Sequence, residues 1–198
     1  MKRLKIGVLA SGGGTNLQSI IDRSLEGSLS ADIIVVISNN SGAKAFDRAR
    51  NHGIEALHVS SVTEGSDEGV DRRIAEEMRS RGVDLVVLAG YMKKIGPELL
   101  KAFDGRIINI HPALLPKFGG KDMYGIRVHE AVIAAGEKES GPTVHIVDGR
   151  YDHGRILAQE KVPVLPDDTP DTLQKRVLVK EHEILPDTLQ KLAEEWDI

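Results

Sequence analysis

Short apolar runs alternate with segments of helical periodicity along the first two thirds of the chain. Runs rich in Val, Ile and Leu predict buried strands at residues 4–10, 33–37, 54–59, 84–89 and 106–110. Apolar residues spaced three and four apart predict helices at residues 15–26, 43–51, 66–81, 97–103 and 128–135. Strands that alternate with crossover helices pair in parallel, so the pattern predicts an α/β fold with a doubly wound, mostly parallel sheet.

The pattern changes in the last third of the chain. Residues 143–147 and 155–162 read as two strands joined by a short, turn-rich link, which predicts an antiparallel hairpin near the C-terminus. A late helix is predicted at 169–183, with Thr169 as its N-cap. We expect Pro186 to break or kink that helix, because proline cannot donate the helical hydrogen bond.

Length and composition fit one soluble domain that covers residues 1–198. The chain has 26 Lys and Arg against 30 Asp and Glu, a net charge of −4, which argues against a dedicated nucleic-acid binder. The absence of cysteine excludes disulfides, a thiolate nucleophile and cysteine-ligated zinc. The first apolar run, residues 6–10, is too short for a signal peptide or a spanning helix, so we expect a cytoplasmic protein. Residues 112–125 lack a regular pattern, and loops of that length are usually functional or mobile.

A glycine-rich loop follows the first predicted strand. The segment Ser11-Gly12-Gly13-Gly14-Thr15-Asn16 lets a ligand approach the backbone closely, and the helix after it offers free N–H groups and a positive dipole end. This combination binds anions, most often phosphate. The dinucleotide fingerprint is incomplete, because Leu17 holds its third glycine position. The loop therefore predicts a site for a phosphorylated small molecule, with a glycine turn needed only for tight packing as the alternative.

Two polar side chains close the fifth predicted strand. Asn109 and His111 are two residues apart and so project to the same side, while Pro112 ends the strand ladder. Open α/β sheets bind their ligands at the carboxyl ends of strands. An amide and an imidazole aimed at one point suit an oxyanion at a carbonyl carbon. A buried polar pair that satisfies local backbone groups is the alternative.

An aspartate after residues 143–147 is the third candidate. An ion pair between Asp152 and His111 would raise the histidine pKa, so that an imidazolium donates a proton. From its position alone, a turn aspartate before a glycine is the commoner explanation. His145 lies in the middle of a strand and is a further candidate for the same cleft. No pair of histidines has metal-ligand spacing, so we expect no metal site.

Five segments together indicate a family. They are Ser-Gly-Gly-Gly-Thr-Asn-Leu at 11–17, Leu-Ala-Gly-Tyr-Met at 88–92, Ile-Asn-Ile-His-Pro-Ala-Leu-Leu-Pro at 108–116, Asp152 with Gly154, and Lys-Glu-His-Glu-Ile-Leu-Pro at 180–186. With these segments, which span nearly the whole chain, the sequence resembles the folate-dependent glycinamide ribonucleotide transformylases, also called phosphoribosylglycinamide formyltransferases. The third segment is specific to formyltransferases in general, and the first and last narrow the resemblance to the purine enzymes.

The resemblance implies a Rossmann-like formyltransferase fold and a one-carbon transfer reaction. A formyl group would pass from the co-substrate 10-formyltetrahydrofolate to the amine of glycinamide ribonucleotide, in de novo purine (IMP) biosynthesis. Asn109, His111 and Asp152 are implied as the catalytic residues. The implied chemistry needs no metal and no covalent enzyme intermediate. The expected partners are small molecules, with no nucleic acid and no membrane, and the chain is expected to be a monomer or a homodimer.

The resemblance also implies where the two substrates bind. The ribonucleotide would lie on Gly14, Thr15, Asn16 and Glu181. The folate would lie against a second set of residues, namely Met92, Lys93, Lys94, Ile95, Asn109 and Val147.

Several positions depart from the family pattern. Asp67 stands where relatives often carry a basic residue for the folate glutamate tail, and Leu178 where they often carry Lys or Gln near the phosphate. Lys180 is the candidate replacement for the missing phosphate contact. The loop 117–125 is expected to close over the ribonucleotide, with a static surface loop as the alternative.

Two other functions fit parts of the sequence. A formyltetrahydrofolate hydrolase usually carries an extra amino-terminal domain and a transfer-RNA formyltransferase an extra carboxy-terminal one. We expect neither, because the chain begins at its first strand and ends soon after its late helix. A catalytically silent ligand-binding module would keep the glycine loop and lose the Asn-His-Asp set, yet all three residues are present.

Overall fold

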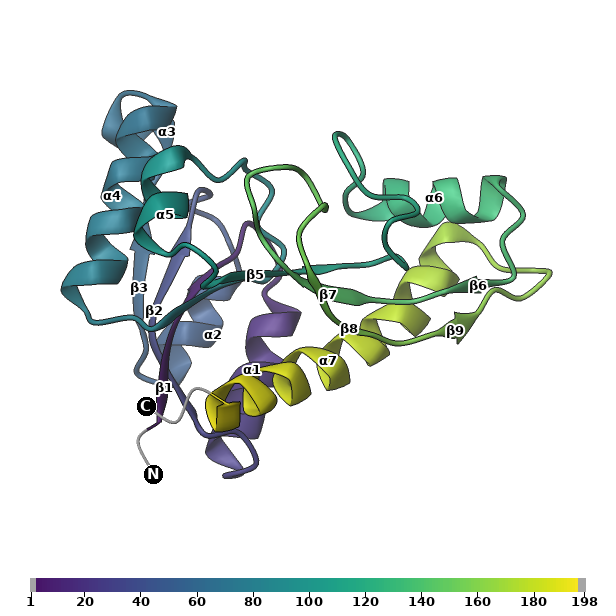
Figure 1. The fold of residues 1–198 in the computed structure, drawn as a ribbon, viewed down its shortest axis with the longest axis horizontal. Helices are drawn as coiled ribbons and strands as arrows, with labels where there is room; N and C mark the ends of the chain where they lie inside the picture. The colour runs from purple at the N-terminus through teal and green to yellow at the C-terminus, as the bar shows by residue number, and fades with distance from the viewer. Residues whose placement is uncertain (1–2, 196–198) are drawn as a thin grey trace.

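A seven-stranded sheet with helices on both faces organises the computed structural model, which describes residues 3–195 (Figure 1). The strands of this sheet are β1 (Leu4–Leu9), β2 (Ala31–Ser38), β3 (Glu55–His58), β4 (Leu85–Leu88), β5 (Ile107–His111), β7 (Thr143–Ile146) and β8 (Ile156–Gln159). Their order is β3-β2-β1-β4-β5-β7-β8. The first five are parallel, whereas the β5–β7 and β7–β8 pairs are antiparallel. The predicted mostly parallel sheet and its late hairpin are confirmed.

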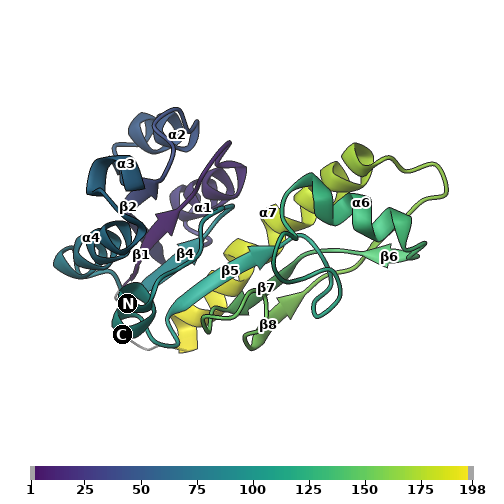
Figure 2. The ribbon, with the colours of Figure 1, turned by 90° about the horizontal axis from the view of Figure 1, so that it is seen from above.

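Helices cover both faces of the sheet, as doubly wound folds require. They are α1 (Thr15–Leu25), α2 (Ala45–Asn51), α3 (Ser61–Glu64), α4 (Asp67–Ser80), α5 (Pro97–Ala102), α6 (Ile126–Ala134) and α7 (Pro170–Glu195). The helices α1, α2 and α7 share one apolar core with the sheet, and α4 and α5 share the other (Figure 2). A fully buried Leu or Ile side chain, such as Leu17 or Ile20, contributes roughly 1.5–3 kcal/mol to this packing.

A second, two-stranded sheet lies at the end of the molecule opposite α3 and α4 (Figure 1). Its strands are β6 (Glu139–Ser140) and β9 (Val162–Pro163), which pair antiparallel. The predicted single strand at 155–162 is therefore wrong in extent, because β8 pairs with β7 and the chain then leaves to pair with β6. The sequence also gave no sign of α3, which is too short for a periodic pattern and is held by reciprocal capping between Ser60 and Thr63.

The late helix is longer than predicted. Thr169 caps it as expected, since the Thr169 hydroxyl accepts a hydrogen bond from the Thr172 N–H at 3.2 Å. The expected break at Pro186 is wrong, because α7 continues to Glu195. Apolar side chains on both sides of the proline, Leu185 and Leu189, are fully buried in the core. Their burial offsets the roughly 3 kcal/mol that an interior proline costs a helix.

The strand order brings three chain segments to one edge of the sheet. The carboxyl ends of β1, β4 and β5 meet there, on both sides of the point where the strand order reverses between β1 and β4. The glycine loop follows β1, residues 89–95 follow β4, and Asn109 and His111 end β5. Among residues 3–195, no helix is long and apolar enough to cross a membrane.

Candidate active site

A cavity of about 810 Å³ opens at this edge of the sheet. Its walls are the glycine loop, the segment after β4, the end of β5, part of the loop before α6, the link after β7 and one face of α7. Twelve of the residues that the sequence analysis assigned to catalysis or binding line it, namely Gly14, Thr15, Asn16, Met92, Lys93, Lys94, Ile95, Asn109, His111, Val147, Asp152 and Glu181. Segments far apart in the sequence therefore form one site.

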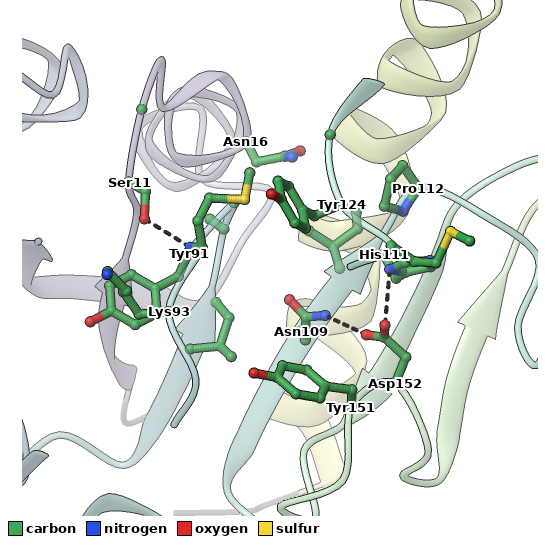
Figure 3. A pocket seen from close by; sticks show the side chains of 18 of the residues that line it. Ser11, Asn16, Tyr91, Lys93, Asn109, His111, Pro112, Tyr124, Tyr151 and Asp152 are labelled. Carbon is green, nitrogen blue, oxygen red and sulfur yellow. Dashed lines mark hydrogen bonds and ion pairs between the residues drawn. The ribbon is translucent and has the colours of Figure 1, made fainter. Parts of the chain in front are cut away.

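Asn109, His111 and Asp152 point toward one another in this cavity (Figure 3). Asp152 Oδ2 lies 3.5 Å from His111 Nδ1, and Asp152 Oδ1 accepts a hydrogen bond from Asn109 Nδ2 at 3.4 Å. Asn109 Nδ2 is also 3.1 Å from His145 Nε2. The His145 Nδ1–H donates to the Ile146 carbonyl, so its Nε2 accepts from the asparagine amide. The three predicted residues thus form a hydrogen-bonded group that includes His145.

His111 is buried between two acceptors. Its Nε2 donates to the Phe118 carbonyl at 2.8 Å, and its Nδ1 faces the Asp152 carboxylate. We expected Asp152 to raise the pKa of His111, but burial lowers this pKa below its ordinary value, and the attraction of Asp152 opposes the effect only in part. Asp152 thus acts on this pKa in the expected direction, but burial outweighs it in the free protein. Only the imidazolium can donate from both nitrogens, and both nitrogens of His111 face acceptors. The site therefore suits a positively charged His111, although burial disfavours that charge. A negative charge on a bound substrate would favour it.

Asp152 is held ionised in an uncommon backbone conformation. Burial raises its pKa, but the nearby His145 ring, whose Nε2 lies 3.5 Å from Asp152 Oδ1, the charge of His111 and the Gly120 N–H together lower it below the ordinary value. The Gly120 N–H donates to Asp152 Oδ2 at 2.9 Å. Asp152 has φ 52°, in the left-handed region, and such strain is often found at functional sites. Gly154 allows this turn, because a Cβ there would overlap the Ile146 carbonyl.

The glycine loop ends at Gly14, the N-cap of α1. Gly14 has φ 68°, and a Cβ at this position would lie 2.9 Å from the Cα of Ala45 in α2. Both the backbone conformation and the close approach of α2 therefore require glycine here. The loop leads directly into the open, positive end of α1, as the sequence predicted.

The Gly14→Ala variant should be less stable than the natural chain. We expect a loss of about 1–3 kcal/mol in the free energy of unfolding from the left-handed backbone alone, plus the overlap with Ala45. Urea unfolding measures it. Gly13→Ala is the matched control, since a Cβ at Gly13 meets no atom within 4 Å. Equal unfolding free energies for the two variants would contradict this account.

Asn16 and Glu181 meet at the α1 end of the cavity, although 165 residues separate them. Asn16 Nδ2 donates to Glu181 Oε2 at 2.6 Å, and both side chains are about 8% exposed. Burial raises the pKa of Glu181, and the hydrogen bond from Asn16 opposes it. Asn16 Oδ1 is buried without a hydrogen-bond partner in residues 3–195. A buried acceptor without a partner is costly, so this atom is available to a ligand donor.

The segment after β4 forms the opposite wall. Met92 is 53% exposed, and the Lys94 ammonium lies 6.0 Å from the centre of the Tyr151 ring. Ser11 Oγ accepts a hydrogen bond from the Met92 N–H at 2.8 Å, which ties this wall to the glycine loop (Figure 3). A second cavity, of about 1060 Å³, shares Lys93 and Lys94 with the first and has Asp67 in its lining.

The expectation for Lys180 is wrong, whereas the expectation of an irregular loop at residues 112–125 is confirmed. Lys180 does not replace a phosphate contact here, because its ammonium lies 2.7 Å from Glu183 and 3.3 Å from Glu160 and does not line the cavity. Residues 112–125 have no helix or strand, as predicted, and they carry the Phe118 carbonyl and the Gly120 N–H that contact His111 and Asp152.

His129 is a lining residue that the sequence analysis did not assign. Its side chain is 1% exposed on α6, and its Nδ1 has no hydrogen-bond partner within residues 3–195. Burial, with a further contribution from the charge of His111, lowers the pKa of His129 to about 4. The sequence signal was only an i,i+1 His-Glu pair, which does not distinguish a buried histidine from an exposed one.

In the same described part of the chain, no group of three or more His, Asp or Glu side chains could hold a metal ion.

The low pKa of His129 predicts acid sensitivity. The unfolded chain binds a proton at this residue below pH 6.5, but the folded chain does so only near pH 4, so stability falls as pH drops through that window. The shift corresponds to about 3 kcal/mol. His129→Gln should therefore lose less stability between pH 7 and pH 5 than the natural chain in urea unfolding. His52→Gln, at an exposed histidine, should lose as much as the natural chain. The same acid loss in His129→Gln and the natural chain would show that another group is responsible.

A family comparison agrees with this architecture and site. Residues 4–189 match the family described as formyl transferase. The chain therefore belongs to the formyl transferase family, and it is a formyltransferase by sequence and by fold.

Within this family, several relatives are purine enzymes of the kind that the sequence segments indicated. The chain is 43% and 45% identical to the chloroplastic phosphoribosylglycinamide formyltransferases of Arabidopsis thaliana and Vigna unguiculata, in each case over 98% of its own length. It spans 67% and 62% of the length of these two plant relatives. The crystal structure of glycinamide ribonucleotide transformylase 1 from Symbiobacterium toebii superposes with a TM-score of 0.93 at 42% identity, covering 98% of this chain and 89% of that one.

Proposed function

We propose that this protein transfers the formyl group of 10-formyltetrahydrofolate to the amine of glycinamide ribonucleotide, in the synthesis of purines. One observation carries the proposal: a single cavity joins a glycine loop at a helix N-terminus to the Asn109, His111 and Asp152 group. The loop suits a phosphate, and the polar group suits a carbonyl that becomes an oxyanion. A cavity of about 810 Å³ falls within the range of ligand pockets.

The ribonucleotide would bind along the α1 side of the cavity. Its phosphate would accept hydrogen bonds from the N–H groups of Gly14, Thr15 and Asn16. The ribose hydroxyls would meet Glu181, and one of them would donate to the unpartnered Asn16 Oδ1. The glycyl amine would then point toward Asp152.

The folate would enter from the opposite wall. Its pteridine would lie against the segment from Met92 to Ile95 and against Val147, with Asn109 in contact with the formyl end. The exposed ammonium groups of Lys93 and Lys94 would attract the carboxylates of the folate tail. Asp67, in the second cavity, would weaken that attraction, so the tail contact is expected to be less favourable on that side.

The proposed reaction is a direct attack. The neutral amine nitrogen attacks the formyl carbon, and negative charge grows on the formyl oxygen. Asn109 and His111 donate hydrogen bonds to that oxygen, which requires the Asn109 amide to exchange its present acceptors for the oxyanion and the His111 Nε2–H to exchange the Phe118 carbonyl for it. The growing negative charge favours the protonated form of His111, which burial alone disfavours. Asp152 stabilises this imidazolium as well.

Proton movement completes the transfer. The amine loses one proton, which the ionised Asp152 accepts directly or through an ordered water. The bond between the formyl carbon and the folate nitrogen breaks, and that nitrogen takes up the proton that Asp152 received, which regenerates the carboxylate. The products are the formylated ribonucleotide and tetrahydrofolate, so atoms and charges balance.

Consumption of the formyl donor tests the proposal and its rivals. Purified protein is mixed with 10-formyltetrahydrofolate, with and without glycinamide ribonucleotide, and tetrahydrofolate is measured by absorbance. We expect consumption only when the ribonucleotide is present. Consumption without the ribonucleotide would favour a formyltetrahydrofolate hydrolase, and no consumption in either mixture would favour a ligand-binding module.

A further inference from the structure

The glycine loop is held from outside the cavity by the short helix α2. The Ala45 N–H donates to the Gly12 carbonyl at 3.2 Å, and Arg48 Nε donates to the Gly13 carbonyl at 2.8 Å. A second nitrogen of the same guanidinium, Nη1, donates to Gln18 Oε1 at 3.1 Å, on the first turn of α1. Arg48 therefore connects the loop to the helix that follows it.

These contacts set the direction of the loop peptides. In a trans peptide, the carbonyl and the following N–H point to opposite sides. Since α2 holds the carbonyls of Gly12 and Gly13, the N–H groups of Gly13 and Gly14 point away from α2. The Gln18 N–H donates to the Gly14 carbonyl at 2.9 Å, which leaves the N–H groups before it at the open end of α1. The loop is thus fixed with its donors available to a ligand and its acceptors occupied.

Arg48 also brings the positive charge that the neighbouring groups do not supply. Leu178 carries none, and Lys180 is paired with Glu160 and Glu183. Burial lowers the pKa of His182, and the charge of Arg48 lowers it further while Asp22 opposes the shift, so the charged form of this histidine is disfavoured.

A second observation shows that this end of the cavity is built for a ligand. Asn16 is more than nine-tenths buried and lines the cavity, and its Oδ1 has no partner in the described part of the chain. Its Nδ2 is already used by Glu181. The loop that Arg48 fixes therefore leads directly to a polar atom that needs a donor from outside the protein.

We propose that Arg48 is a positioning residue for the ribonucleotide phosphate, acting through the Gly13 carbonyl to keep the loop N–H groups directed at the anion. This inference rests on the proposed function. It predicts that removing the guanidinium weakens recognition of the phosphate and leaves both the folate site and the catalytic group intact.

Calorimetric binding to three variants tests the inference. The probes are glycinamide ribonucleotide, its unphosphorylated ribonucleoside and a non-transferable folate analogue. Arg48→Ala should weaken binding of the ribonucleotide at least about tenfold, the scale of a lost charged hydrogen bond, and leave binding of the other two probes within about twofold. Arg48→Lys, which keeps one donor and the charge, should recover part of the loss. Arg50→Ala is the matched control, because Arg50 is two residues away on α2 and lies over the Phe46 ring instead.

The outcomes separate a positioning role from a structural one. A rise in KM for the ribonucleotide with kcat kept within about threefold would support the proposal. Equal ribonucleotide affinity in Arg48→Ala and the natural chain would overturn it, and so would an equal loss for all three probes, which would indicate general damage to the fold. If the natural chain bound no ribonucleotide, the proposed function itself would fall and this inference with it.

Discussion

The His111→Ala variant should turn over at least about 100-fold more slowly than the natural chain, with its fold intact. Loss of one oxyanion donor raises the barrier by about 2.7–4 kcal/mol, and in the proposed mechanism His111 becomes such a donor when its Nε2–H leaves the Phe118 carbonyl for the oxyanion while its Nδ1 stays with Asp152. Steady-state kcat with both substrates saturating measures the effect. Circular dichroism and calorimetric binding of the ribonucleotide check that the variant still folds and binds.

His52→Ala is the control for this prediction. His52 is exposed at the end of α2 and does not line the cavity, so its removal should leave kcat unchanged. If folded His111→Ala retained near-normal turnover, the imidazole would have no part in the reaction and the mechanism would need another donor.

The Asp152→Asn variant is expected to lose activity on a similar scale. Asparagine keeps nearly the shape of the side chain, but it removes the charge that stabilises a protonated His111 and the base that receives the amine proton. We expect kcat to fall at least about 100-fold, because a group that acts in the transition state supplies about the same stabilisation as an oxyanion donor. Asp187→Asn, at a surface carboxylate paired with Arg23 at 2.7 Å, is the matched control and should keep full activity.

The double variant tests whether the two residues act together. If Asp152 works largely through His111, the variant with both changes should be little slower than the slower single variant, because catalytic groups that act as a unit are not additive. Losses that multiply across the two changes would mean that each residue acts independently.

Local sequence signals were sufficient for the parallel part of the fold. The β-branched runs and the three-and-four spacing of apolar residues place the parallel strands and the helices on both faces, because each element must bury one face or both. Pro186 shows where a local rule fails. Proline tends to break a helix because of its backbone, but the buried residues beside Pro186 keep α7 continuous. The extent of β8 and the existence of β9 depend on pairing with distant strands, which no local pattern records.

The candidate site was predictable where spacing along one element sets the geometry. Asn109 and His111 share a side because strand residues alternate, and the glycine loop lies at the start of a helix. The position of Glu181 came from family resemblance. For Asp152 the sequence alone favoured an ordinary turn residue over a partner of His111, since 43 residues separate Asp152 from Asn109. Burial of His111 and His129, and hence the direction of their pKa shifts, depends on packing that becomes visible only in three dimensions.

A crystal structure with glycinamide ribonucleotide and a non-transferable formylfolate analogue bound is the most direct test of the chemistry. We predict that the glycyl nitrogen lies beside the carbon that stands for the formyl group, with Asp152 in hydrogen-bond reach of both that nitrogen and His111. An Asp152 carboxylate turned out into solvent while both ligands are seated would contradict the account.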